Sequence, residues 1–278
     1  MPVGEKLFLS SQSFGFGPTA ELVHIAKGFK KSNTLKTADL YVYDTPEVKA
    51  ILDQTKSGLK RIAGKEEGRD VMEFLRQYGR ECGFDRIFSS YDAAPVFYGW
   101  FHGIPCYFYD GMLSFWDVES FRESINGNLE ILEDAKRRKD EDKMVRLYRE
   151  ITANNHHESI FLAYFLADRN FARGGDNPFR KFKDFSQLQG KTKIVGGIID
   201  PDMPYDAELK RDHVLISLSA SLVPTVSFEQ NLTFARNTLN FVIQNCRGFG
   251  NAPCIMSVNP KIFEALQEAG YLANLPCN

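Results

Sequence analysis

The stretch EKLFLSSQSFGFGPTAELVHIAKGFKK, from Glu5 to Lys31, joins an apolar run to an amphipathic pattern through a loop with two glycines and a proline. The run from Glu5 to Ser11 predicts a β-strand, and the segment from Thr19 to Lys31 predicts a helix. Four apolar residues share one face of that helix, namely Leu22, Ile25, Ala26 and Phe29. A strand that leads through glycines into a helix is the first half of a strand–helix–strand unit, the repeat from which parallel α/β sheets are built.

Strand-like and helix-like segments keep alternating up to Asp110. Runs at 38–44, 84–92 and 104–110 read as strands, and runs at 46–64, 68–83 and 93–103 read as helices. Repeated units of this kind connect parallel strands by right-handed crossovers. We therefore predict an α/β fold with a Rossmann-like open parallel sheet and helices on both of its faces.

The chain is expected to divide near residue 200. We predict a first α/β domain at 1–200, with a helical insertion at about 117–173, where few strand signals occur. The Pro- and Asp-rich stretch 201–212 is suited to a linker. The alternation restarts at 213–278, but two strand–helix units cannot cover both faces of their own sheet. We expect this tail either to extend the first sheet or to be the start of an incomplete second α/β domain.

Composition argues against several classes of protein. The 278 residues are 43% hydrophobic and 25% charged, with a formal net charge of -2, which is ordinary for a soluble globular protein and speaks against nucleic-acid binding. The five cysteines form no C-x-x-C pair, so neither a zinc site nor a disulfide framework is indicated, and a reducing compartment fits best. No apolar run approaches the roughly 18 residues of a membrane span. We therefore expect a cytoplasmic protein without a membrane span.

The opening loop allows two interpretations. GFGPTA at residues 15–20 formally matches G-x-G-x-x-G/A between a strand and a helix, where backbone N–H groups and the helix dipole favour an anion. However, Pro18 removes one N–H group, and Asp44 matches only inexactly the ribose-binding acid of dinucleotide sites. Alternatively, the glycines only permit the turn, while Thr19 caps the helix and Glu21 lies in its first turn.

Polar residues also occur where the predicted strands end. Ligands of open α/β sheets bind beyond the carboxyl ends of the strands. One rim of the predicted sheet would therefore collect Ser13, Ser89, Ser90, Asp92 and Asp110. A carboxylate there can accept a proton from an alcohol and so generate a nucleophile. Alternatively, Asp92 caps the following helix and Asp110 begins a turn with the next glycine.

Two patterns imitate metal sites. His156 and His157 are adjacent and point about 100° apart on a helix, so they do not form the i, i+4 pair of a zinc protease. Asp200-Pro201-Asp202 imitates a D-x-D metal motif, but its place in the proline-rich linker favours coincidence. We therefore predict no metal site. The motifs of α/β-hydrolases and P-loop NTPases are absent from the sequence as well.

Taken together, four segments resemble a two-domain GT-B glycosyltransferase. They are SSQSFGFGPTAELVHIAKGFKK (10–31), FDRIFSSYDAAPVFYGWFHGIPCYFYDGM (84–112), KIVGGIIDP (193–201) and HVLISLSAS (213–221). The first is similar to the glycine-containing first loop and helix of that family, and the second to a stretch in which G-I-P leads a strand. The third is similar to the strand that closes the N-terminal domain, and the fourth to the first strand of the C-terminal domain. The resemblance depends on the four segments occurring in this order, and not on any one of them alone.

The resemblance implies an acceptor-binding domain at 1–200 and a donor-binding domain from 213 onward. It implies transfer of a sugar from a nucleotide-diphosphate sugar to a small-molecule acceptor, with no metal and no further cofactor, because backbone amides and basic side chains stabilise the leaving diphosphate. The residues that the resemblance implicates are Glu21 or Asp92 as the base, Ser13 and Asp110 near the acceptor, and Gly15, Gly17, Ser219 and Ser221 near the donor.

The sequence departs from the family at two points. FGP stands in place of the glycine–histidine pair of the first loop, so a base must come from Glu21 or Asp92, unless transfer is retaining. From the resemblance, the glycine-rich donor loop and the ribose-binding acid of the family would be expected beyond Asn278.

Two other functions therefore stay open. One is a non-catalytic binding half, which a second chain would complete by supplying the donor loop. The other is an NAD(P)-dependent oxidoreductase that uses Gly15-x-Gly17-x-x-Ala20.

Overall fold

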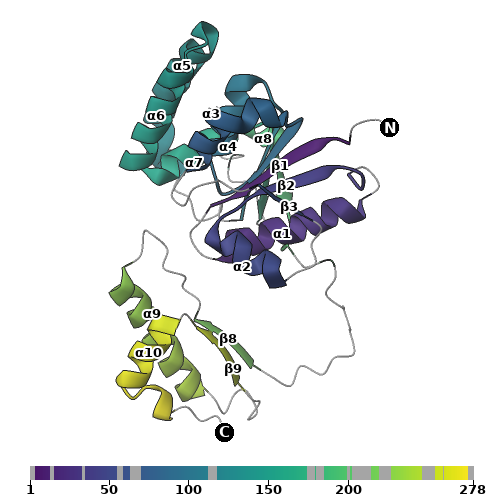
Figure 1. Ribbon diagram of the computed structural model, residues 1–278. Coiled ribbons are helices and arrows are strands. Elements are labelled where there is room, and N and C mark those ends of the chain that lie inside the picture. The colour runs from purple at the N-terminus through teal and green to yellow at the C-terminus, as the bar shows by residue number, and fades with distance from the viewer. Residues whose placement is uncertain are drawn as a thin grey trace. The chain divides into compact units, whose positions relative to one another are not determined.

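The computed structural model describes residues 4–12, 16–32, 35–54, 59–62, 70–111, 118–173, 179, 185–198, 201, 214–218, 227–245, 254–258 and 260–274. The chain forms two compact units, residues 1–202 and residues 203–278. Each unit has its own sheet and its own helices (Figure 1). The two units are described separately.

The first unit is built on a parallel sheet. Among the described residues it has seven strands in the order β3-β2-β1-β4-β5-β6-β7, and every neighbouring pair is parallel. The strands are β1 (Lys6–Ser11), β2 (Asp39–Tyr43), β3 (Lys60–Ile62), β4 (Arg86–Ser90), β5 (Cys106–Asp110), β6 (Arg169–Arg173) and β7 (Thr192–Val195). This order is that of a Rossmann-like sheet, which reverses its direction of growth between β1 and β4.

Helices cover both faces of this sheet (Figure 1). Helices α1 (Phe16–Lys31) and α2 (Pro46–Gln54) pack on one face. The helices of the other face are α3 (Val71–Cys82), α4 (Ala94–His102), α5 (Arg122–Arg138), α6 (Glu141–Asn154), α7 (His156–Leu166) and α8 (Ser186–Lys191), preceded at α5 by the short 3-10 turn η2 (Val118–Phe121). The predicted fold class of unit 1 is therefore confirmed.

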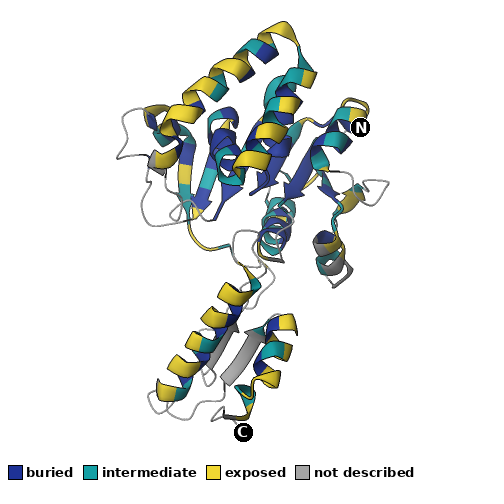
Figure 2. Cartoon of the chain, turned by 90° about the vertical axis from the view of Figure 1, so that its left-hand side faces the viewer, coloured by how far each residue is buried: buried dark blue, intermediate teal, exposed yellow. Residues whose placement is uncertain are grey.

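The strands alternate between two hydrophobic clusters. Leu7 and Leu9 of β1 face α1 and α2, whereas Phe8 faces the larger helical layer. All three are at most 3% exposed, so the strand is apolar on both sides, as parallel strands between two helical layers are. In Figure 2 the sheet of unit 1 is mostly the dark blue of buried residues, and yellow lies on the outer helix surfaces.

Helix α4 packs unusually closely on β4 and β5, and a glycine makes this possible. A Cβ atom on Gly99 would lie 2.2 Å from the Sγ atom of Cys106 and 2.8 Å from the Cδ1 atom of Ile87. The helix ends at Gly103, whose φ of 72° belongs to the left-handed region that favours glycine. Gly99 therefore lets α4 lie directly against the first residues of β4 and β5.

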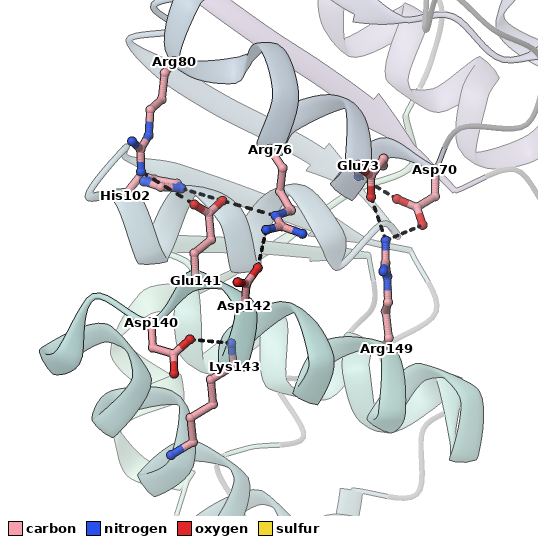
Figure 3. A network of polar contacts seen from close by, with 10 residues as sticks. All are labelled: Asp70, Glu73, Arg76, Arg80, His102, Asp140, Glu141, Asp142, Lys143 and Arg149. Atoms are coloured by element: carbon pink, nitrogen blue, oxygen red, sulfur yellow. Dashed lines mark hydrogen bonds and ion pairs between the residues drawn. The ribbon is translucent and has the colours of Figure 1, made fainter.

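Ion pairs join α6 to α3, and a contact between His102 and Glu141 joins α6 to α4 (Figure 3). Arg149 of α6 lies 2.9 Å from Glu73 of α3, and Glu141 at the start of α6 lies 3.3 Å from the Nε2 atom of His102. Burial lowers the pKa of His102, although Glu141 acts in the opposite direction. These contacts fix the position of the helical layer. Their residues lie on the helices, away from the carboxyl ends of the strands.

The second unit contains a smaller parallel sheet. Strands β8 (Val214–Leu218) and β9 (Cys254–Val258) pair in parallel. Helices α9 (Phe228–Asn245) and α10 (Pro260–Glu268), followed by the 3-10 turn η6 (Leu272–Asn274), form its hydrophobic cluster around Leu232, Leu239 and Leu266. These elements agree with the strand–helix units that the sequence predicts after residue 212.

Three sequence-based assignments in unit 1 were wrong in detail. The predicted helix 46–64 ends at Gln54, and residues 60–62 form strand β3 beside β2. The helical insertion does not reach residue 173, because Arg169–Arg173 is strand β6 of the main sheet. Helix α1 begins at Phe16, so Thr19 lies inside it and is not its N-terminal cap.

Candidate active site

The sheet has its topological switch point between β1 and β4, where such folds open a crevice at the carboxyl ends of the strands. Both strands end in serines that lie side by side, with Ser10 paired to Ser89 and Ser11 paired to Ser90. All four serines are buried. At this edge, both strands therefore end in small side chains that carry hydroxyl groups.

These hydroxyl groups hold the start of α1 over the strand ends. The Ser11 and Thr19 hydroxyl oxygens are 3.0 Å apart. The Ser90 hydroxyl donates to the carbonyl of Pro18 over 3.5 Å, and the backbone N–H of Gln12 donates to the carbonyl of Ser90 over 3.0 Å. The first turn of α1, which contains exposed Gly17, thus faces outward at the switch point.

Asp92 follows β4, and both of its carboxylate oxygens accept hydrogen bonds from other protein groups. Its Oδ2 atom accepts a hydrogen bond of 2.6 Å from Ser10, and its Oδ1 atom accepts one of 3.1 Å from the backbone N–H of Ala94. Burial raises the pKa of this carboxyl to about 6, against the effect of the two hydrogen bonds. Asp92 is 6% exposed, so it links β1 to the start of α4 and offers little surface to a substrate.

Asp110 is also buried and also forms a hydrogen bond within the protein. It ends β5, and its Oδ2 atom accepts a hydrogen bond of 2.8 Å from the hydroxyl of Tyr164 in α7. Burial and the neighbouring Asp110 raise the pKa of that tyrosine. The contact joins the carboxyl end of β5 to the helical layer behind it.

Glu21 is the carboxylate that reaches the surface of this edge. It lies in the second turn of α1, and its Oε1 atom is 3.2 Å from the Nη1 atom of Arg173, the last residue of β6. The Glu21 side chain is 16% exposed and that of Arg173 is 47% exposed. Burial raises the pKa of Glu21, whereas Arg173 lowers it. The pair therefore places a hydrogen-bond acceptor, Glu21, beside a hydrogen-bond donor, Arg173, and both side chains are partly exposed.

Two tyrosines complete the surroundings of Glu21. The rings of Tyr91 and Tyr109 meet edge to face, with centroids 5.9 Å apart, and their hydroxyl groups help to lower the pKa of Glu21. Tyr109 is 1% exposed, yet among the described residues its hydroxyl makes no hydrogen bond of normal geometry. The buried hydroxyl of Tyr109 therefore acts on Glu21 from within the protein.

The backbone is adapted to place Tyr91. This residue has φ of 59°, a left-handed conformation that is rare for an aromatic residue, and its N–H donates to the carbonyl of Tyr109 over 2.9 Å. A Cβ atom on Gly111 would lie 2.1 Å from the Tyr91 hydroxyl, so a glycine leaves the room for that group. Strained backbone of this kind is concentrated at functional sites.

The predicted site residues thus fall into three groups. Glu21 is partly exposed, whereas Asp92 and Asp110 lie at the same edge but are buried and form hydrogen bonds with other protein groups. Gly17 is in the first turn of α1. Four others lie outside the described residues: Ser13, Gly15, Ser219 and Ser221.

Sequence reasoning missed Tyr91, Tyr109 and Arg173. Tyr91 stands directly before Asp92 and Tyr109 directly before Asp110, so both were within reach of the strand-end argument. Arg173 had no such signal, because the sequence did not reveal β6. Asp44, the inexact candidate for a ribose-binding acid, directly follows β2, and its Oδ1 atom is buried without a partner among the described residues.

Two kinds of feature are absent from the described ranges of the chain. No group of three or more His, Cys, Asp or Glu residues in that part of the chain is placed to hold a metal ion. None of the helices described above is both long enough and apolar enough to cross a membrane.

Comparison with known proteins gives structural similarities only. No protein-family model and no curated protein sequence matches the chain. The chain resembles the structure of S. aureus MnaA with UDP at a TM-score of 0.51 and 11% identity, over 98% of this chain and 67% of MnaA. The similarity supports a fold of the GT-B type, with parallel α/β sheets.

Two further similarities have lower scores. The kitacinnamycin glycosyltransferase gives a TM-score of 0.45 at 11% identity, over 94% of this chain and 67% of that protein. Anabaena HepE in complex with UDP-glucose gives 0.38 at 15% identity, over 69% of this chain and 43% of HepE. The chain therefore spans about two thirds of MnaA and of the kitacinnamycin enzyme, and less than half of HepE.

Proposed function

We propose that the chain acts in sugar transfer, as a GT-B-type glycosyltransferase or the acceptor-binding part of one. The observation that carries the proposal is Glu21, a partly exposed carboxylate with a raised pKa that is paired with Arg173 beside the switch point. The GT-B-like fold and the similarity to a protein studied with UDP support a nucleotide-diphosphate sugar as the donor.

In this proposal Glu21 is the general base. The acceptor oxygen forms a bond to the anomeric carbon, the bond from that carbon to the diphosphate breaks, and the acceptor proton passes to Glu21. A base is more effective when its pKa approaches the working pH, so burial of Glu21 favours the reaction. Arg173 keeps the carboxylate in place and keeps part of it ionised.

Donor binding is proposed for the first turn of α1 and for the start of unit 2. Gly15 and Gly17 would let the diphosphate approach backbone N–H groups, which a helix start presents. Ser219 and Ser221 remain candidate donor contacts. Asp92 and Asp110 are assigned a positioning role, since the partners of both carboxylates are protein groups.

One observation favours a second candidate function. Asp44 directly follows β2, which is where dinucleotide-binding folds place the acid that binds ribose, and its buried Oδ1 atom has no partner among the described residues. An NAD(P)-dependent oxidoreductase is therefore the alternative.

Ligand binding separates these functions. The full chain would be titrated with UDP-glucose, UDP and NAD⁺ while its melting temperature is followed, since a ligand that binds only the folded state raises it. Transfer would be measured as UDP release, with the glycosylated product identified by mass spectrometry. We expect stabilisation by UDP and UDP-sugars. Stabilisation by NAD⁺ alone would reject the transferase in favour of the oxidoreductase, and binding without product formation would indicate a non-catalytic binding half.

A further inference from the structure

Helices cover one face of the sheet in unit 1 over only part of its width. On this face α1 packs on β1 and β4, and α2 lies beside α1. On the opposite face α4 and α7 pack on β5, and α8 packs on β7. The described residues place no helix over β5, β6 and β7 on the face of α1. Because parallel sheets are normally covered on both faces, this uncovered part is a candidate docking surface.

Apolar and aromatic side chains line the uncovered part. Tyr107 of β5, Phe171 of β6 and Val195 of β7 belong to the hydrophobic cluster of this face, and all three are only partly buried. A cavity of about 300 Å³ lies next to them, and Phe29 of α1 and Ile198 also line it. An apolar surface with a hollow beside it is typical of a site where a partner inserts large side chains.

Two exposed cations border this apolar surface. Successive residues of a strand point to opposite faces, so Arg169 lies on the face of Phe171, two positions before it in β6. Lys193 is the register partner of Phe171 and stands two positions before Val195, which places it on the same face. Both cations are exposed, and neither forms an ion pair with a described residue. We call the surface of Tyr107, Phe171, Val195, Arg169 and Lys193 the β5–β7 face.

The spacing of the sheet favours a helix as the occupant of the β5–β7 face. Strands lie about 4.8 Å apart and packed helices about 8–10 Å apart, so one helix covers roughly two strands. Since α1 covers β1 and β4, the next helical position lies over β5 and β6. An extended segment fits less well, because the backbone groups of these strands are already paired with one another and cannot pair with it. A helix satisfies its own backbone hydrogen bonds.

The charge of the β5–β7 face indicates which helix fits. Carboxylates beside the apolar stripe of a helix would pair with Arg169 and Lys193, the two cations that have no ion pair among the described residues. A second copy of this chain that docked through the same face would bring like charges together, because a two-fold contact places the same surface of both copies against each other.

We propose that the β5–β7 face binds an acidic amphipathic helix of a partner protein. The apolar stripe of that helix lies on Phe171 and Val195, with large side chains in the cavity, and its carboxylates pair with Arg169 and Lys193. This surface adds a binding function to the chain and does not depend on the proposed sugar transfer.

A designed peptide tests the proposal. The peptide has about 18 residues, with leucines at i, i+3, i+4 and i+7 spacing and glutamates on both sides of the leucine stripe. Its binding to the full chain would be measured by calorimetry, beside that of one peptide with lysines in place of the glutamates and one with serines in place of the leucines. We expect saturable one-to-one binding of the glutamate peptide, and binding about tenfold weaker or worse for the other two.

The double variant Arg169→Glu/Lys193→Glu reverses the two cations. We expect it to bind the glutamate peptide about tenfold more weakly than the wild-type chain does, and to bind the lysine peptide more tightly. Arg137→Glu/Arg146→Glu makes the same change of net charge at exposed positions of α5 and α6, and it should bind like the wild-type chain. Circular dichroism would show that each variant is folded.

Three results would overturn the proposal. The first is the absence of saturable binding of the glutamate peptide to the wild-type chain. The second is equal binding of that peptide to the wild-type chain and to folded Arg169→Glu/Lys193→Glu. The third is self-association of the wild-type chain in analytical ultracentrifugation that this double variant removes, since a second copy would then be the occupant. None of these measurements uses a nucleotide, so failure of the proposed function would leave their results unchanged.

Discussion

The Oε1 atom of Glu21 lies 3.2 Å from the Nη1 atom of Arg173, although 152 positions separate the two residues in the sequence. The contact connects the second turn of α1 to the last residue of β6, across the carboxyl ends of β4 and β5. It places a cation beside a carboxylate whose pKa burial raises.

Arg173→Met should move the pH dependence of transfer toward higher pH. Arg173 lowers the pKa of Glu21, so removing the cation raises that pKa further, and a higher pH is then needed to ionise the base. The measurement is kcat/KM for UDP-sugar and acceptor as a function of pH. Arg169→Met, at the start of the same strand, is the matched control and should keep the wild-type profile. An unchanged profile for Arg173→Met would show that Glu21 is not the titrating base.

Asp92→Asn should stabilise the protein at pH 8, and the gain should shrink as the pH falls toward 4. Burial raises the pKa of Asp92 from its ordinary 3.8 to about 6, which corresponds to roughly 3 kcal/mol of destabilisation when the group is ionised. Between these two pKa values the folded state binds more protons than the unfolded state, so this group destabilises the fold progressively as the pH rises through about 6.

The free energy of unfolding of wild type and Asp92→Asn would be measured in urea at pH 4, 6 and 8. A constant difference across this range would contradict the assigned pKa. Asp85→Asn is the control, because Asp85 lies in the turn before β4 and its exposed carboxylate accepts the N–H of Lys6 over 2.8 Å.

Gly99→Ala should destabilise unit 1. The added methyl group would overlap the Sγ atom of Cys106, and forcing an extra carbon into a packed interface costs about 1–3 kcal/mol. Gly127→Ala in α5 is the matched control, because a Cβ atom there meets nothing within 4 Å. An alanine in that helix should stabilise by about 0.5–1 kcal/mol. Thermal unfolding of the two variants checks both signs, and equal melting temperatures would contradict the close packing of α4.

The alternation of strands and helices was predictable because the central strands are apolar on both faces. Strands β1, β4 and β5 each contain adjacent apolar or aromatic residues, namely LFL, IF and CYFY, which short-range patterns reveal. Strand β3 is short and has the sequence KRI at the edge of the sheet, and β6 has the sequence RNFAR. The side-chain amide of the buried Asn170 in β6 donates a hydrogen bond of 2.9 Å to the carbonyl of Tyr164. No local sequence pattern predicts this contact.

The candidate site was predictable only in part, for a similar reason. Glu21 could be identified because it follows the first loop, and Asp92 and Asp110 because they follow strands. Whether each carboxylate is open or buried depends on the partners that the fold brings to it, namely Arg173, Ser10 and Tyr164. These partners come from other elements of the sheet, so sequence position alone could not rank the three acids.

Comparison of Glu21→Gln with the wild-type chain tests the central claim most directly. Both would be assayed for UDP release from a UDP-sugar in the presence of an acceptor, with Glu130→Gln, an exposed position on α5, as the control. We expect Glu21→Gln to lower kcat by about 10²–10⁴-fold, as loss of a general base does, while UDP binding stays within twofold of wild type. Wild-type turnover by Glu21→Gln, or a loss of turnover in Glu130→Gln of the same size, would contradict it.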